Sequence, residues 1–491
     1  MFEQRKQAMW SALQPGGGVE LKSGTVSVPA LGDEPTYVHT YEYLELPEGV
    51  KFSALKTHGR RLLVRECYPV IFDQWWNRTG DDGLEDEGEI LIGTPGVGKS
   101  MFLFYALYRL AQMERKVVFQ STNGACTLFD GDTVDFGEIA ARAAQNPDTV
   151  YLIDASKKGD LKACCGPFLM SSSPNMEVWK RVAEKEIYLQ PYCAPVCSFG
   201  EMLALRELRF GTLSEGVVQE LYTLGGGVAR LLPKKQRNPS RDIASELRDQ
   251  ASGSDIGACR TALVSGTTKL GTESHALFHF FPRDTKGPRV IDVRFGSPYI
   301  ERVFVDAMVK QGRQELVDFI AGAEALPAFP TLRGALYEGW AISELQKGGT
   351  FKCCELLEKG RGDEFDLEVP EAKESLFRGL DDITHVGKLH HRPLVNNFET
   401  VDSFISREWL IQTTVSPTHD VKMTGLNKVL KRLSDCGDET EPRLFFVVPK
   451  DAYDEGYKKQ QPIKTGQNDD AKRAGEAGQT QQFVMCVPPS L

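Results

Sequence analysis

The sequence predicts a multidomain α/β protein, with a mainly parallel sheet in its first half and a second α/β domain toward its end. Three observations predict this class. A glycine-rich loop lies between a short apolar run and a helical apolar pattern, within residues 90–110. Further short apolar runs follow, as in domains built on parallel sheets. The 491 residues also exceed what one hydrophobic core supports.

Composition and charge exclude several classes of protein. Hydrophobic residues make up 41% and charged residues 26%, near the globular average. No window has the ~18 uninterrupted apolar residues of a membrane span, and no apolar signal-peptide core follows the first residues. The 11 cysteines lack repeated zinc-ligand spacing, which favours reduced thiols in an intracellular protein. The net charge of −10 permits only a local basic groove for nucleic acid.

Four segments are expected along the chain. They are an N-terminal extension (1–60), the first α/β domain (61–233), a mostly helical lid or connector (234–320) and the second α/β domain (321–491). Within the last, residues 451–482 are polar with few aliphatic side chains, and a mobile insertion is expected there.

The glycine-rich loop matches a phosphate-binding motif in full. It reads Gly93-Thr94-Pro95-Gly96-Val97-Gly98-Lys99-Ser100. Closely spaced glycines let backbone N–H groups surround phosphate oxygens, and the following helix directs its positive end at them. Lys99 is expected to neutralise the β- and γ-phosphates, and Ser100 to bind Mg²⁺. The loop therefore predicts a P-loop NTPase that binds ATP and Mg²⁺, although its residues do not distinguish ATP from GTP.

Further residues of the first domain are candidates for the same site. Asp154 ends the buried run 150–153 and is expected to hold Mg²⁺ through water. Ala155 follows instead of a second acid, so hydrolysis needs a base from elsewhere or is slow. Ser173 or Asn175 could sense the γ-phosphate, or simply form a turn. The candidate arginine fingers are Arg206, Arg209 and Arg230.

The second domain has the order of elements found in nucleases that use metal-bound carboxylates. A helix at 334–346 precedes three strands, a second helix at 426–433 and a further strand. Acids converging at strand ends are needed for such a site. The candidate ligands are Glu338, Asp402 and Gln412.

This nuclease pattern is incomplete. The usual motif is an acid, then any residue, then a lysine, and this chain has Gln412-Thr413-Thr414 in its place. Lys422 is the candidate for the missing lysine, and His419 is a weaker candidate for the base. An inactive scaffold with ordinary surface acids is the alternative. Three basic residues of the second helix either meet phosphates or form a solvated face, and these are Lys428, Lys431 and Arg432.

Two further pairs of residues have a functional and a structural interpretation. His275 and His279 have the i, i+4 spacing of a helical metal pair, but a packed aromatic segment is the favoured setting. Trp75 and Trp76 either stack on adenine or fill a core.

The chain resembles the Crinkler effectors of oomycetes and chytrids and the related retrotransposon hot spot proteins of trypanosomes. The resemblance spans roughly residues 60–450 and implies a P-loop NTPase fused to a restriction-endonuclease-like domain. The matching pieces are 92–100, 151–154, 172–175, 221–226 and the C-terminal pattern above.

Two functions follow from the residues and the resemblance together. The preferred hypothesis is an ATP-dependent, Mg²⁺-requiring enzyme in which the NTPase domain controls DNA cleavage, acting inside a cell and in a nucleus, including that of a host. The alternative is a nucleotide switch for assembly and partner binding, with a degenerate nuclease fold. The expected partners are a nucleotide and DNA, without a membrane, and self-association through the NTPase domain is a further expectation.

Overall fold

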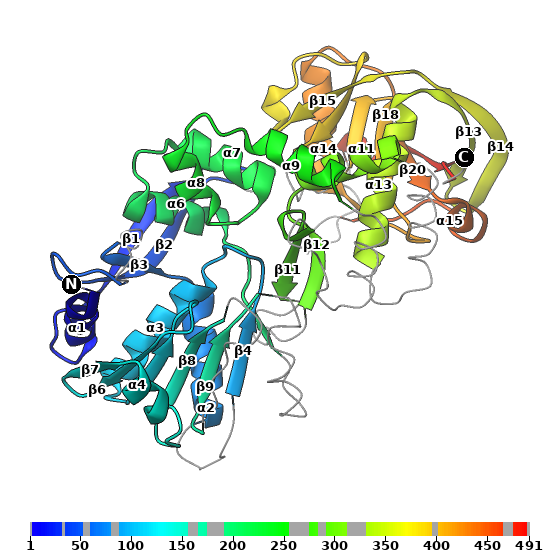
Figure 1. Ribbon diagram of the computed structural model, residues 1–491. Helices are drawn as coiled ribbons and strands as arrows, with labels where there is room; N and C mark the ends of the chain where they lie inside the picture. Colours follow the sequence, from blue (N-terminus) through cyan, green and yellow to red (C-terminus); the bar gives the residue numbers. More distant parts are fainter. Residues whose placement is uncertain are drawn as a thin grey trace. The chain divides into compact units, whose positions relative to one another are not determined.

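The computed structural model describes residues 2–31, 35–52, 59–79, 88–155, 165–173, 191–254, 274–282, 291–311, 330–394, 401–464 and 475–488. The chain forms two compact units (Figure 1). Unit 1 comprises Met1–Val28, Tyr37–Glu246 and Gly257–Gly296, and unit 2 comprises Pro29–Thr36, Leu247–Ile256 and Ser297–Leu491. Among the described residues, no helix is long and apolar enough to cross a membrane.

Unit 1 begins with helix α1 (Phe2–Leu13) and a three-stranded antiparallel sheet. Its strands are β1 (Glu20–Val28), β2 (Tyr37–Glu45) and β3 (Arg61–Val64). Helix α2 (Cys67–Thr79) follows β3 directly. Most of the predicted N-terminal extension therefore belongs to the same unit as the glycine-rich loop 93–100.

The main sheet of unit 1 has seven strands in the order β10-β4-β9-β8-β5-β6-β7. The first five run parallel, and β6 and β7 extend the sheet antiparallel. The parallel strands are buried and consist mostly of apolar residues, as expected for strands covered by helices. The strands are β4 (Gly88–Ile92), β5 (Val117–Gln120), β6 (Cys126–Asp130), β7 (Thr133–Phe136), β8 (Val150–Asp154), β9 (Phe168–Ser171) and β10 (Tyr192–Cys193).

Two apolar clusters form the core around this sheet. Helix α3 (Lys99–Gln112) contributes Leu103, Ala106, Leu107 and Leu110 to the larger one, at the helical spacing seen in the sequence. Helix α4 (Glu138–Ala143) contributes to the smaller cluster. The carboxyl ends of β4, β8 and β9 meet at one edge, where α/β sheets bind ligands.

The second half of unit 1 is a group of helices and a hairpin. The helices are α6 (Phe199–Arg209), α7 (Glu215–Gly225), α8 (Leu231–Arg237) and the short η1 (Ser274–Ala276). Helix α9 (Ile243–Ser252) begins in unit 1, and its residues from Leu247 onward belong to unit 2. Strands β11 (Phe278–Pro282) and β12 (Ile291–Phe295) pair antiparallel. The expectation of a mostly helical 234–320 was wrong at this hairpin, because the aromatic run 278–281 packs as a strand.

Unit 2 holds an eight-stranded mixed sheet in the order β14-β13-β22-β20-β18-β17-β16-β15. Helices α11 (Pro298–Gln311) and α13 (Pro330–Gln346) precede it, and α14 (Met423–Asp435) packs its apolar stripe into the core. The strands are β13 (Gly349–Leu357), β14 (Gly360–Val369), β15 (Lys373–Phe377), β16 (Leu389–Pro393), β17 (Ser403–Ser406), β18 (Trp409–Thr413), β20 (Arg443–Val448) and β22 (Gln481–Cys486).

The predicted mobile insertion, 451–482, contains regular structure in its described part. Helix α15 (Lys450–Glu455) is followed by β21 (Ile463–Lys464), which pairs with β19 (Val421–Lys422), and by η5 (Gly475–Gln479). Tyr453 and Tyr457 are buried in the core of unit 2. Tyrosines supply the apolar contacts that the low aliphatic content did not indicate.

Candidate functional site

The loop between β4 and α3 has a backbone that requires glycine. Gly93, Gly96 and Gly98 have φ values of 147°, 96° and 104°. A Cβ at Gly93 would lie 2.6 Å from the Ala194 carbonyl oxygen, and one at Gly96 would lie 2.6 Å from the Cβ of Arg230. These conformations, which other residues rarely adopt, let the loop curl tightly at the start of α3.

Lys99, the first residue of α3, folds back over this loop. Its Nζ donates hydrogen bonds to the carbonyl oxygens of Gly93 and Thr94, at 2.7 and 3.1 Å. Burial, and to a lesser degree the charge of Arg230, lower the pKa of Lys99 to about 8. An ammonium group held only by carbonyl dipoles has more to gain from an anion than one already paired with a carboxylate.

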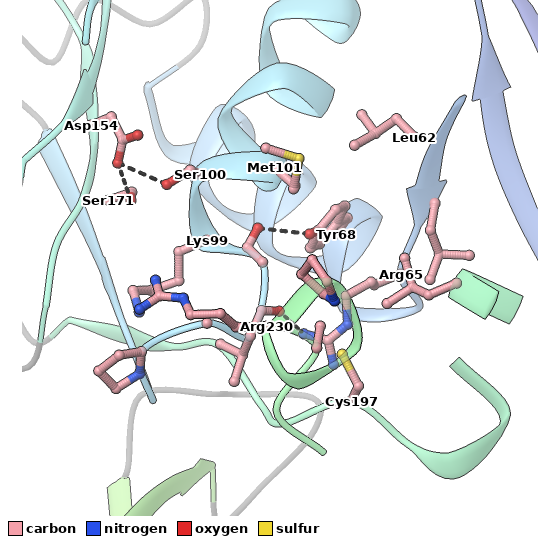
Figure 2. Close-up of a pocket in the computed structure, with 18 of the residues that line it drawn as sticks. Leu62, Arg65, Tyr68, Lys99, Ser100, Met101, Asp154, Ser171, Cys197 and Arg230 are labelled. Atoms are coloured by element: carbon pink, nitrogen blue, oxygen red, sulfur yellow. Dashed lines mark hydrogen bonds between the residues drawn. The ribbon is translucent and has the colours of Figure 1, made fainter. Parts of the chain in front are cut away.

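Asp154 ends β8 and accepts two hydroxyl hydrogen bonds (Figure 2). Its Oδ1 lies 3.0 Å from Ser100 Oγ and 3.1 Å from Ser171 Oγ. Burial raises the pKa of Asp154, while the two hydroxyls and Lys99 oppose that shift. The strand order thus brings together Ser100 and Asp154, which are 54 residues apart in the sequence.

Ser171, at the end of β9, was not predicted. The sequence pointed two residues beyond, to Ser173, or to Asn175. Ser173 lines the same cavity as Ser171, and Asn175 lies outside the described residues. Only the placement of β9 next to β8 shows that the last residue of the strand reaches Asp154.

A buried ion pair supports the loop from behind. Arg65, just after β3, pairs with Glu201 of α6 at 2.9 Å, and both side chains are almost fully buried. Arg65 also donates to the carbonyl oxygen of Val97, at 2.9 Å. Neither residue was predicted, although Ser198 and Glu201 have the S-x-x-E spacing of a capping box, which the structure contains at the start of α6.

A cavity of about 510 Å³ opens over the loop, entirely within unit 1. This volume falls in the range of small-molecule sites. The predicted residues that line it are Pro95, Gly96, Val97, Gly98, Lys99, Ser100, Asp154, Ser173, Arg209 and Arg230.

The three candidate arginines have different surroundings. Arg230 lines the cavity, and its backbone N–H donates to the Gly96 carbonyl oxygen at 3.1 Å. Arg209 lines the cavity as well. Arg206 instead donates to the Leu213 carbonyl oxygen at 2.7 Å, which is a structural role. Arg237, which the sequence did not single out, is a further lining residue.

The tryptophan and histidine pairs of unit 1 belong to the packing. Trp75 is fully buried, and the Trp76 ring stacks on Phe72 with 6.2 Å between centroids. His275 lies on η1 and His279 on β11, so they share no helix. Burial lowers the pKa of both histidines to about 4, as expected for side chains in the aromatic segment.

In unit 2 the three predicted ligands do come together. Asp402, just before β17, accepts hydrogen bonds from Gln412 Nε2 at 2.9 Å and from the Thr413 N–H at 2.6 Å. Burial raises the pKa of Asp402 well above its usual range, and the nearby charge of Glu338 adds to the shift. The ten residues between Asp402 and Gln412 therefore span neighbouring strands, as predicted.

Two residues that the sequence did not indicate complete this cluster. Arg392 of β16 lies 3.6 Å from Glu338 Oε1 and 3.9 Å from Glu301 Oε1. Burial raises the pKa of Glu301 well above normal, with Glu338 as the next cause. The cation beside the acids is therefore Arg392, whereas Lys422 is exposed at the beginning of α14.

The remaining predicted residues of unit 2 have structural settings. The His419 ring lies against Phe446, with 6.5 Å between centroids, and burial lowers its pKa. Arg432 donates to the Ile383 carbonyl oxygen, at 2.6 Å, and so fixes the loop after β15. Lys428 and Lys431 are exposed on α14, as the solvated-face interpretation expects.

Comparison with known proteins shows similarity to two curated proteins. No protein-family model matches the chain. Two curated relatives from Phytophthora infestans do match. Crinkler effector protein 16 is 25% identical over 424 residues, and Crinkler effector protein 15 is 24% identical over 422 residues. Each match covers 82% of this chain and 65% of the relative. The chain is therefore similar to these Crinkler effectors, and the match spans slightly less than two thirds of each relative.

Proposed function

We propose that the chain is a Crinkler-like effector in which unit 1 binds and slowly hydrolyses ATP and thereby controls unit 2. One observation carries the proposal: the Lys99 ammonium and the Ser100–Asp154 pair line the same cavity at the carboxyl edge of a parallel sheet. A full P-loop motif after β4 and an acid at the end of β8, with β9 between these two strands, are the parts that nucleotide phosphates and Mg²⁺ require.

The donor set of this cavity fits Mg²⁺. A hydroxyl and a carboxylate are the hard oxygen ligands that Mg²⁺ takes, and the raised pKa of Asp154 marks a buried carboxylate short of positive charge. Bound Mg²⁺ would neutralise charge on the phosphates. Lys99 would leave the loop carbonyls for the phosphate oxygens, and Arg230 would stabilise the transferred charge. Hydrolysis is slow because Ala155 follows Asp154 where many ATPases have an acid.

For unit 2 we propose metal-dependent DNA cleavage. Among the described residues, no three acidic, histidine or cysteine side chains are arranged to hold a metal ion. Mg²⁺, however, often binds through only one or two carboxylates, so Glu338, Asp402 and the Gln412 amide are a sufficient set. The pKa values of Glu338 and Asp402 are raised because these partly buried acids lose contact with water, and a cation would favour their charged form. A bound metal would supply an activated water.

Two observations favour the alternative, a nucleotide switch with an inactive nuclease fold. Arg392 lies within salt-bridge distance of Glu338 and so competes with a cation, and Thr414 stands where lysine is usual. In that case unit 2 would bind a partner instead of cutting DNA. We further propose, from the effector relatives, that the protein acts inside host cells, with the nucleus as the compartment where DNA is available.

A plasmid assay separates the two functions. Purified protein is incubated with Mg²⁺, ATP and supercoiled plasmid, beside Lys99→Ala, Asp402→Ala and, as a matched control, Asp363→Ala on the exposed face of β14. We expect wild type and Asp363→Ala to nick DNA, and Asp402→Ala to hydrolyse ATP without nicking. If the wild type hydrolyses ATP without nicking DNA, the nuclease hypothesis is lost and the nucleotide switch is the remaining function. Unchanged nucleotide binding in Lys99→Ala would overturn the phosphate site itself.

A further inference from the structure

The cavity of unit 1 is chemically asymmetric. Lys99, Ser100 and Asp154 give one end charge and hydrogen-bonding groups. Apolar side chains line the same cavity elsewhere, among them Leu62, Met101, Leu205 and Phe210. In Figure 2, Leu62 and Met101 lie on one side of Ser100, and Asp154 and Ser171 lie on the other. The loop requires the charged end, but nothing in the P-loop motif requires the apolar one.

Three separate elements supply the apolar end. Leu62 comes from β3, and Met101 from the first turn of α3, directly after Ser100. Leu205 and Arg209 are one turn apart on α6, so they share a helix face, and Phe210 follows that helix. Met101, Leu205 and Phe210 are partly exposed, which leaves apolar surface open to the cavity.

The order of residues along α3 fixes the direction of a bound nucleotide. Its terminal phosphate must lie by Lys99 and Asp154, where the charges are. The sugar and base then extend past Ser100, away from Asp154, which is the side where Leu62 and Met101 lie (Figure 2). A nucleoside triphosphate has the same asymmetry as the cavity, since it is highly charged at one end and flat and weakly polar at the other.

We propose that Leu62, Met101, Leu205 and Phe210 form a base-binding subsite. A purine ring would pack there between the side chains of Leu62 and Met101, from β3 and α3, and those of Leu205 and Phe210, at the end of α6. Burial of a flat ring against apolar side chains does not distinguish the groups on the ring's edge, and Arg61, which lines the cavity, is already paired with Glu45 at 2.6 Å. A purine ring buries more apolar surface than a pyrimidine ring, so the ligand class is purine nucleoside triphosphates, with ATP and GTP bound within ten-fold of each other. This inference rests on the proposed nucleotide site.

The test compares ligands with and without a base. Calorimetry on the full chain in Mg²⁺ measures ATP, GTP and inorganic tripolyphosphate, for wild type, Phe210→Ala and Lys99→Ala. Ile139→Ala, on the exposed surface of α4 and outside the cavity, is the matched control. We expect wild type to bind ATP at least ten-fold more tightly than tripolyphosphate. Phe210→Ala should lose most of that difference, with tripolyphosphate affinity changed less than two-fold.

Photolabelling of the wild type with 8-azido-ATP avoids reliance on a variant that folds poorly. A label on 61–63, Met101 or 205–210 supports the subsite, and a label confined to other segments overturns it. Equal binding of ATP and tripolyphosphate would also overturn the subsite while leaving the phosphate site intact. If neither ligand binds, the proposed function fails, and this inference fails with it.

Discussion

The protonation of Lys99 should make nucleotide affinity depend on pH. Its pKa of about 8 in the free protein means that it is charged below that pH and neutral above it. A bound phosphate favours the charged form of Lys99, so above pH 8 binding requires Lys99 to take up a proton, and this weakens the affinity. We expect nucleotide affinity to be about ten-fold weaker at pH 9 than at pH 7. Calorimetry at constant ionic strength measures this, and Lys99→Arg, which stays charged, should not show the dependence. Equal wild-type affinities at both pH values would contradict it.

The Arg65–Glu201 pair provides the second residue-scale prediction. Removing one partner of a buried ion pair leaves the other charge uncompensated, so Arg65→Ala should lower the free energy of unfolding by about 3–5 kcal/mol. The exposed pair Glu138–Arg142 is the control, and Arg142→Ala should cost about 0.5 kcal/mol or less. Urea denaturation of both variants checks this, and similar losses for the two would refute the structural role of Arg65.

Residues of the site could be predicted where the evidence for them lies in a short stretch of the sequence. The loop glycines, Lys99 and Ser100 lie within eight consecutive positions, so their spacing alone indicates phosphate chemistry. Ser171 and Arg392 join their sites through strand neighbours, and no local pattern marks a serine or an arginine that pairing brings next to an acid.

At the scale of elements, the turn between α7 and α8 depends on Gly227. A Cβ there would lie 1.9 Å from the Cys197 carbonyl oxygen, so Gly227→Ala should cost about 1–3 kcal/mol and displace Arg230 from the loop. Gly216→Ala, on the exposed side of α7 with open space around its Cβ, should be neutral or slightly stabilising. Thermal melts and nucleotide titrations test both. A Gly227→Ala protein with wild-type stability would show that this turn is free to move.

Periodicity predicted helices better than it predicted sheet neighbours. The stripe of α14 and the apolar positions of α3 were read correctly because one helix face alone carries the signal. The hairpin β11–β12 was missed since four consecutive aromatic or histidine residues show no alternation. Strand β14 was also missed, because its many exposed acids give it the composition of a loop. It forms a strand through its pairing with β13.

For the whole molecule, each apolar cluster formed by the described residues lies within one unit, and this makes control by nucleotide testable. A ligand that binds one folded unit at 100 times its dissociation constant stabilises that unit by about 2.7 kcal/mol. If the units unfold independently, differential scanning calorimetry should show two unfolding transitions. Mg²⁺ with ATP should then raise only the transition temperature of unit 1. If nucleotide controls unit 2, as proposed, the second transition should move as well.

We expect both transitions to move in the wild type, because an effect of ATP on unit 2 requires a difference in free energy that unfolding also reports. Lys99→Ala should remove both shifts. Asp402→Ala, which alters only the acidic cluster of unit 2, should leave the unit 1 shift intact. A shift confined to unit 1 in every protein would mean that nucleotide binding and the acidic cluster are energetically independent, and the proposed control would then be lost even if each unit were active.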